Sequence, residues 1–169
     1  DANNNNHIGV PLTIFTANDK TNILVLEHGT NHFGEIPYSA RIAEPDYAII
    51  TNIGESHIEF LKDRDGVLKE KSALFIEAAK NNGLVFINND DEKLCGLRKL
   101  YKNSITFGFK GKCDVKGKLL RYNQSGMPEI EISYKEKKFK VTIPLLGESS
   151  AINFLASAAI ALIVGLTPR

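Results

Sequence analysis

Cysteine and net charge are both scarce in this sequence, and each scarcity narrows the possible functions. The two cysteines, Cys95 and Cys113, lie far apart and fit no metal-ligand spacing. Isolated cysteines of this kind predict a reducing, cytoplasmic setting. Lys and Arg together number 21 and Asp and Glu 20, so the formal net charge is +1. A charge this small predicts that no bulk field recruits nucleic acid or an anionic membrane.

Long apolar runs and phosphate-binding motifs are missing as well. No stretch approaches the length that crosses a bilayer, and no signal-peptide pattern stands at the start, so we expect no membrane partner. The most apolar segment, residues 151–166, is interrupted by Asn153 and Ser157 and is more typical of a core helix. The sequence contains neither G-x-x-x-x-G-K-[S/T] nor G-x-G-x-x-G, so it offers no phosphate cradle of its own.

The residues that are present have the pattern of an α/β domain. The chain has 169 residues, of which 43% are hydrophobic and 24% charged, which is enough for one domain with a core. Apolar runs alternating with helical segments predict a mostly parallel sheet flanked by helices, followed by a small antiparallel subsheet. The chain opens on an asparagine-rich tail and stops just past a predicted helix, so we interpret it as a fragment of a longer enzyme.

We expect the sheet edge to be organised around residues 23–31. Residues 23–26 are a continuous apolar run ended by turn residues, which is typical of a strand buried on both faces. In open α/β sheets, ligands bind beyond the carboxyl ends of such strands, and Glu27 stands at that position. A carboxylate buried there without a partner would be costly, so we expect Glu27 to meet a cation, a hydrogen-bond donor or a metal.

A second buried-type strand is predicted over residues 47–53, after a helix over 38–43, and His57 follows it. Strand, helix and strand in this order predict a right-handed parallel unit, which brings Glu27 and His57 to one edge of the sheet. A histidine after a strand can cap a loop, or, paired with Glu27, it can be a ligand. The other histidines lack such a pairing and are interpreted as surface or loop residues: His7, His28 and His32.

A helix predicted over residues 66–81, with Asp65 as its cap, carries a further candidate. Apolar residues recur on one face at helical spacing, and Lys71 falls on or beside that face. A lysine at such a place can extend its charged end to solvent. Alternatively, a lowered pKa lets the lysine be modified or act on a phosphate. Spacing alone leaves both alternatives open.

The remaining elements are predicted from periodicity and turn residues. We expect a short helix or strand over residues 12–15, a loop over 33–37, strands over 84–87 and 104–109, and between these strands a helix capped by Asp90 or Asp91 that runs to about residue 101. The antiparallel strands are predicted over 115–122, 129–134 and 139–143, with turns at 123–126 and 135–138. A loop over 144–150 precedes a helix over 151–164, with Ser149 or Ser150 as its cap.

Four segments, in their order and spacing, resemble the central domain of the Mur ligases: residues 5–13 (Asn-Asn-His-Ile-Gly-Val-Pro-Leu-Thr), 26–36, 51–57 and 70–75. The resemblance covers nearly the whole chain. It implies a P-loop NTPase-like fold in which residues 1–169 form the ATP-binding central domain, truncated before the phosphate-binding loop. The N-terminal UDP-binding domain and the C-terminal domain of the family are expected to lie outside this chain.

The resemblance also implies a reaction, since it is nearest to the members that add D-alanyl-D-alanine to UDP-N-acetylmuramoyl-tripeptide in peptidoglycan precursor synthesis. In these enzymes ATP phosphorylates the peptide carboxylate, and the amine of D-alanyl-D-alanine attacks the acyl phosphate. The longer parent is expected to be a bacterial, monomeric, cytoplasmic enzyme, and the fragment alone is expected to be inactive.

Site roles are implied residue by residue where the motifs match. Glu27 would bind the magnesium ion that bridges the ATP phosphates, and His57 a second magnesium ion near the transferred phosphoryl group. Lys71 matches a carbamylated lysine whose added carboxylate supports the second ion, so His57 and Lys71 are the catalytic candidates. The remaining candidates are asparagines: Asn52 and Asn153 for the nucleotide, and Asn5, Asn6 and Asn31 for the substrate.

Two departures from the family pattern keep other functions open. Ser149-Ser150 stands where the family has His-Asn before the last helix, and Ala73 stands where a glutamate often follows the modified lysine. These changes are compatible with a divergent ligase or with a non-catalytic Mur-like binding domain. Another ligase of the superfamily, such as folylpolyglutamate synthetase, is a third alternative, and the segment over residues 5–11 argues against it.

Overall fold

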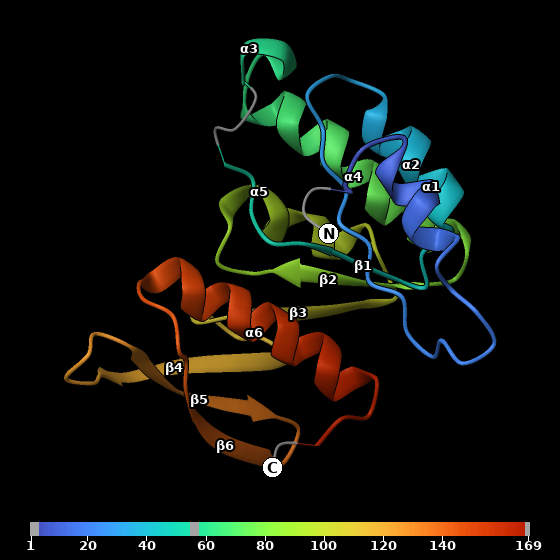
Figure 1. The fold of residues 1–169 in the computed structure, drawn as a ribbon. Coiled ribbons are helices and arrows are strands. Elements are labelled where there is room, and N and C mark those ends of the chain that lie inside the picture. Colours follow the sequence, from blue (N-terminus) through green and yellow to red (C-terminus); the bar gives the residue numbers. More distant parts are fainter. Residues whose placement is uncertain (1–3, 55–57, 168–169) are drawn as a thin grey trace. The chain divides into compact units, whose positions relative to one another are not determined.

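Residues 4–54 and 58–167 are described by the computed structural model (Figure 1). Their contacts separate into two units. Unit 1 consists of Asp1–Ala48 and Ile53–Leu84, and unit 2 of Ile49–Asn52 and Val85–Arg169. In the described part of the chain, no helix combines the length and the apolar character needed to cross a membrane.

Unit 1 is built from helices α1 (Gly9–Ile14), α2 (Glu35–Ala43), α3 (Ile58–Leu61) and α4 (Arg64–Lys80). Helix α4 packs against α2 and α3, and α2 against α1. The helix predicted over 66–81 is confirmed, but its cap is Asp63 and not Asp65. Asp63 has extended backbone, so its carboxylate reaches forward to accept the Gly66 N–H at 2.8 Å, whereas Asp65 already lies inside the first turn.

Helix α2 begins earlier than the sequence pattern indicates, so the loop predicted over 33–37 is wrong from Glu35 onward. Pro37 lies in the first turn of α2, where its missing N–H leaves no hydrogen bond unmade. Helix α1 confirms the helical alternative for residues 12–15 and also begins earlier, at Gly9. The side-chain oxygen of Asn6 accepts the N–H groups of Ile8 and Gly9 at 3.0 and 2.9 Å, which starts that helix.

The buried strand predicted over residues 23–26 is wrong. The segment forms neither helix nor strand, and Ile23 and Val25 are 60% and 84% exposed. A strand needs a neighbour to complete its ladder of hydrogen bonds, and no strand in the described residues pairs with this one. The strand-helix-strand unit predicted from this segment is therefore wrong too, and Glu27 lies in an exposed loop, not at the end of a buried strand.

The six-stranded sheet has the order β1-β2-β3-β4-β5-β6. Its strands are β1 (Tyr47–Ile50), β2 (Leu84–Asn88), β3 (Ser104–Gly108), β4 (Val115–Tyr122), β5 (Pro128–Tyr134) and β6 (Lys137–Thr142). Strands β2, β3 and β4 run parallel, whereas β4, β5 and β6 pair antiparallel. The predicted fold class, a mostly parallel α/β sheet with an antiparallel subsheet, is confirmed.

The core of unit 2 lies between this sheet and helix α6 (Glu148–Ile163), which packs on β3, β4 and β5 (Figure 1). Buried residues of the sheet and the helix fill it: Phe86, Phe107, Ile130, Ile132 and Leu155. Helix α6 starts after Gly147, whose φ is +89°, and no side chain caps it. The predicted caps, Ser149 and Ser150, lie inside the helix, and the Ser150 hydroxyl donates to the Leu146 carbonyl at 2.6 Å.

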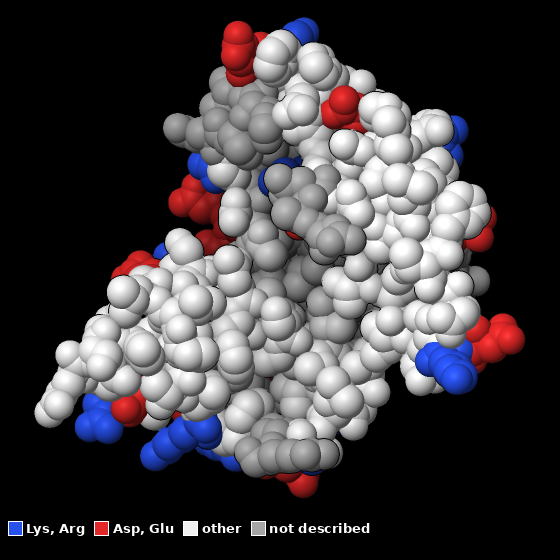
Figure 2. All heavy atoms as spheres, viewed as in Figure 1, with Lys and Arg blue, Asp and Glu red and all other residues white. Residues whose placement is uncertain are grey.

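The long helix predicted after β2 is broken into α5 (Glu92–Cys95) and the 3₁₀ helix η1 (Gly96–Lys99). Asp91 is the cap, because its carboxylate accepts the N–H groups of Lys93 and Leu94 at 2.9 and 3.1 Å. On the face that Figure 2 shows, the described Lys, Arg, Asp and Glu side chains form small separate groups.

Candidate functional site

Asn5 joins the start of the chain to the loop that carries Glu27. Its side-chain amide donates to Oε1 of Glu27 at 3.2 Å, and its backbone carbonyl accepts the Gly29 N–H at 2.7 Å. Gly29 permits this approach, since a Cβ at its position would lie 2.9 Å from Cγ of Asn5. Two segments that are distant in sequence are thus held together at Glu27, the carboxylate around which the sequence predicts the site.

A cavity of about 220 Å³ lies beside this junction in unit 1. Its lining residues come from the N-terminal segment, the loop after Glu27 and helix α2: Asn5, Asn6, His7, Gly29, Thr30, Asn31, Glu35 and Ser39. All three predicted substrate residues, Asn5, Asn6 and Asn31, therefore line one cavity. The side-chain oxygen of Asn6 already accepts two backbone N–H groups, so its free polar group toward a ligand is the amide nitrogen.

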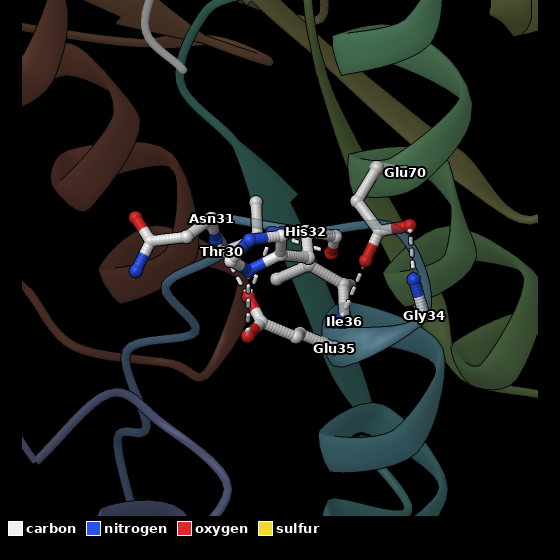
Figure 3. Close-up of polar contacts among 7 residues, drawn as sticks. All are labelled: Thr30, Asn31, His32, Gly34, Glu35, Ile36 and Glu70. Carbon is white, nitrogen blue, oxygen red and sulfur yellow. Dashed lines mark hydrogen bonds and ion pairs between the residues drawn. The ribbon is translucent and has the colours of Figure 1, made fainter. Parts of the chain in front are cut away.

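Two carboxylates hold the loop that borders this cavity (Figure 3). Oε2 of Glu35 accepts the N–H groups of Asn31 and His32 at 2.6 and 3.0 Å. Glu70 reaches over from α4 and accepts the N–H groups of Gly34 and Ile36 at 2.9 and 2.8 Å. The hydrogen bond from the Asn31 N–H is the largest influence on Glu35 and keeps the pKa of its carboxyl below the usual value.

His28 is more than the loop residue that the sequence suggested. Its Nδ1 lies 2.8 Å from Oγ of Ser39, a buried residue of α2. Burial lowers the pKa of the His28 imidazole below its ordinary value near 6.5, because the charged form loses hydration there. The loop after Glu27 is therefore tied to α2 by the His28 ring as well as by the Glu35 carboxylate.

Glu27 offers a carboxylate that suits a hard cation. It also borders a second cavity, of about 380 Å³, in unit 1. Only its Oε1 is engaged by a described residue. No three His, Cys, Asp or Glu residues within 4–54 and 58–167 are placed to hold a metal together. Magnesium is commonly bound by one or two carboxylates, waters and substrate phosphates, so Glu27 fits this ion without an all-protein cage.

Lys71 is half-buried on α4, as the helical periodicity predicted, and it directly follows Glu70. It takes part in at least one polar or electrostatic interaction. It lines neither of the two cavities of unit 1 described above. His57, the other predicted catalytic residue, lies outside the described residues.

Unit 2 contains a larger cavity, of about 710 Å³, at the ends of its parallel strands. Asn52, Asn88 and Asp90 stand just past β1, at the end of β2 and just past β2, and Ser149 comes from the first turn of α6. This is where open α/β sheets bind ligands. Of the two predicted nucleotide residues, Asn52 lines the cavity, whereas Asn153 is exposed one turn further along α6 and does not line it.

Several residues at these sites were missed by sequence reasoning. Glu35, Glu70 and Ser39 bind loop backbone or the His28 ring, and Asn88 is a buried amide whose Nδ2 donates to the Thr51 carbonyl at 2.7 Å. Glu70 stands next to Lys71 and falls among apolar positions of α4, which was a usable signal. Nothing in the pattern distinguishes Glu35 or Ser39 from solvated helix residues.

Comparison with known proteins places these observations in a family. The model of the Mur ligase middle domain matches residues 1–161. The UDP-N-acetylmuramoyl-tripeptide–D-alanyl-D-alanine ligases of Haemophilus influenzae and Bacillus subtilis are 34% and 35% identical to the chain over 167 and 168 residues. Each match covers 99% of this chain but only 36% and 35% of the relative. The chain therefore spans about a third of the length of these relatives.

Solved structures agree with the sequence comparison. MurF from Acinetobacter baumannii superposes with a TM-score of 0.87 at 28% identity, over 99% of this chain and 36% of that one. The MurF ligase of Thermotoga maritima in complex with ADP gives a TM-score of 0.79 at 29% identity, over 96% of this chain and 38% of that one. With the family model matched from residue 1 to residue 161, the chain belongs to the Mur ligase family, whose middle domain it represents.

Proposed function

We propose that this chain is the ATP-binding middle part of a ligase that adds D-alanyl-D-alanine to UDP-N-acetylmuramoyl-tripeptide. The observation that carries the proposal is the match over 99% of the chain to two ligases of that name. The geometry of unit 1 supports it, because Asn5 and Glu27 meet beside a cavity lined by Asn5, Asn6 and Asn31.

The proposed reaction joins a carboxylate to an amine. The terminal carboxylate of the tripeptide attacks the γ-phosphorus of ATP, and the bond from that phosphorus to ADP breaks. The amine of D-alanyl-D-alanine then attacks the acyl carbon, the bond to phosphate breaks, and an amide, phosphate and a proton result. Little covalent chemistry falls to the protein in such a transfer, so its side chains mainly position the reactants and stabilise charge.

Three side chains take the proposed metal and catalytic roles. Glu27 and His57 would each hold a magnesium ion, and these ions would neutralise charge on the phosphates. Nζ of Lys71, as the neutral amine, would add to carbon dioxide and release a proton, which would give a carbamate whose oxygens could serve as magnesium ligands.

The nucleotide and the substrate are assigned to different cavities. Asn5, Asn6 and Asn31 would contact the UDP-linked peptide in unit 1. Asn52 would contact the nucleotide in unit 2, where the cavity at the strand ends supports the assignment. For Asn153, the proposed contact with the nucleotide rests only on its match to the family motif. The ADP complex of the Thermotoga maritima relative supports nucleotide use by this family.

The proposed activity needs more than these 169 residues. The chain has no P-loop motif and spans about a third of its relatives, so we assign the phosphate-binding loop, the UDP-binding domain and the C-terminal domain to the rest of a longer parent. We place this parent in the cytoplasm as a monomer. Both cysteines are free thiols, which supports a reducing compartment.

The test is turnover by the longer protein with UDP-N-acetylmuramoyl-tripeptide, D-alanyl-D-alanine, ATP and magnesium, followed by phosphate release and mass spectrometry of the product. We expect the wild type to form the pentapeptide product. The turnover of Lys71→Ala should be lower than that of the wild type by about a hundredfold. An added short carboxylic acid should restore part of it. Lys69→Ala, at an exposed position of the same helix, is the control and should keep its turnover.

Two results would count against the proposal. A correctly folded wild type that forms no product would remove the ligase assignment and favour a binding domain that kept the fold. Turnover by Lys71→Ala equal to that of the wild type would show that Lys71 is a helix-face lysine without a catalytic role.

A further inference from the structure

Glu70 is a buried carboxylate for which the proposed reaction has no use. Its residue is 3% exposed, and it directly precedes Lys71 on α4. Oε2 accepts the Gly34 N–H at 2.9 Å and Oε1 accepts the Ile36 N–H at 2.8 Å. A buried charge is costly unless it is hydrogen-bonded, and here both oxygens of the carboxylate are bound by backbone.

The two donors belong to the start of α2 (Figure 3). Gly34 is the residue before the helix, with φ +97°, and Ile36 lies in its first turn. The first N–H groups of a helix have no partner within it. Gly34 has no side chain that could accept them, so Glu70 supplies the missing cap from another helix. Its charge also faces the positive end of the α2 dipole.

The loop before α2 is fixed by the same chemistry. Glu35 accepts the N–H groups of Asn31 and His32, so four backbone N–H groups between residues 31 and 36 end on two carboxylates. Glu35 belongs to the loop's own helix and stiffens it internally. Glu70 belongs to α4, so it ties the loop, with Asn31 on the cavity wall, to the helix that carries Lys71.

We propose that Glu70 is a positioning residue, which holds the cavity-lining loop over residues 29–36 at a fixed place relative to Lys71. This inference rests on the proposed function, because it assigns the loop to the substrate and Lys71 to the reaction. The charge and both oxygens are required. A glutamine at position 70 has a single acceptor oxygen, and its NH₂ group would face one of the two backbone N–H groups, donor against donor.

The test compares Glu70→Gln with Glu77→Gln in the full-length ligase. Glu77 lies two turns further along α4 and pairs with Lys80 at 2.8 Å, so its variant removes the same charge without touching the loop. We expect Glu70→Gln to lower kcat about tenfold or more, because small misplacements of reacting groups are costly, while the KM for ATP changes less than about twofold. Glu77→Gln should change neither value.

Hydrogen exchange of the metal-free and nucleotide-free protein gives a readout apart from activity. Glu70→Gln should speed exchange at the amides of Gly34 and Ile36 and leave the amides of β2 and β3 unchanged. If this variant does not fold, Glu70→Asp, which keeps the charge on a shorter side chain, is measured in the same way. Selective loss of protection at these two amides together with lower kcat supports the proposal in either variant.

Two outcomes overturn the proposal. One is unchanged kcat with unchanged protection of Gly34 and Ile36. The other is loss of protection throughout unit 1 in parallel with lost activity, which would make Glu70 a stabilising residue only. A wild type without ligase turnover would defeat the proposed function instead, and the exchange measurement would still decide whether Glu70 holds the loop.

Discussion

Two apolar runs of the chain look alike in sequence and end in opposite surroundings. Residues 84–87 form most of β2, where Val85, Phe86 and Ile87 are completely buried. In residues 23–26, which are equally apolar, Val25 is 84% exposed. The difference lies in the neighbours, since β2 is flanked by β1 and β3, whereas no described strand pairs with residues 23–26. An apolar run shows that a segment can be buried, but whether it is buried depends on the strands that lie beside it.

The residues that follow the two runs differ in the same way. Asn88, at the end of β2, is 3% exposed, donates to the Thr51 carbonyl at 2.7 Å and accepts the Asp90 N–H at 2.9 Å. Glu27, after the other run, is exposed and receives one hydrogen bond from a described residue, Asn5. In unit 2 the polar side chain completes a packed sheet at the wall of a cavity, whereas in unit 1 the corresponding side chain is exposed to solvent.

The largest effect that tests this comparison comes from the same truncation made in both runs. Val85→Ala should lower the free energy of unfolding by about 2–3 kcal/mol, because two buried methyl groups are lost and a cavity remains. Val25→Ala should change it by less than about 0.5 kcal/mol, since the side chain is already in water. Urea titration of both variants measures the two values.

Equal losses in the two variants would break the comparison. They would mean that Val25 is buried in solution, by another copy of the chain or by a rearranged neighbour. Repeating the titration at several protein concentrations separates these causes, because only burial by another copy depends on concentration.

A smaller effect is expected from the polar residues beside the two runs. Asn88→Ala leaves the Thr51 carbonyl and the Asp90 N–H without their partners and should cost about 1–3 kcal/mol. Asn5→Ala removes one partly exposed contact with Glu27 and should cost less than about 0.5 kcal/mol. Thermal unfolding of both variants provides the measurement. A larger loss of stability for Asn5→Ala than for Asn88→Ala would mean that the fold depends on Asn5 and not on Asn88.

Much of the fold of unit 2 follows from local pattern. The apolar runs at residues 84–87 and 104–109 and the alternation after residue 115 correspond to β2, β3 and the antiparallel strands. Apart from β1, which neighbours β2, all of these strands pair with strands that lie close to them in the chain, and local pattern captures such an arrangement. Helix ends were less predictable. Asp63 and Asp65 are equally good caps by residue type, and only the extended backbone at Asp63 decides between them.

The candidate site was predictable only in part, for a physical reason. Glu27 and Lys71 are visible from their places in a motif, but the meeting of Asn5 with Glu27 depends on a backbone contact between distant segments, at Gly29. Glu70 acts through backbone N–H groups, which every residue except proline has, so no residue type marks its partners. Side chains that bind backbone are therefore harder to recognise than side chains that bind each other.

The smallest predicted effect tests the loop of unit 1 alone, through His28. Burial lowers the pKa of this imidazole, so the folded protein favours the neutral ring that lies 2.8 Å from Ser39. In the unfolded chain the ring binds a proton more readily. The free energy of unfolding should therefore fall as the pH drops from above about 6.5 through the lower pKa of the folded state.

The variant His28→Gln should lose this part of the decline in stability, whereas His32→Gln, at a side chain 62% exposed, should keep it. Denaturant titrations between about pH 8 and pH 5 give the three curves. Parallel curves for the wild type and His28→Gln would show that the ring is as hydrated in the folded loop as in the unfolded chain, and the loop after Glu27 would then be as open as the run that precedes it.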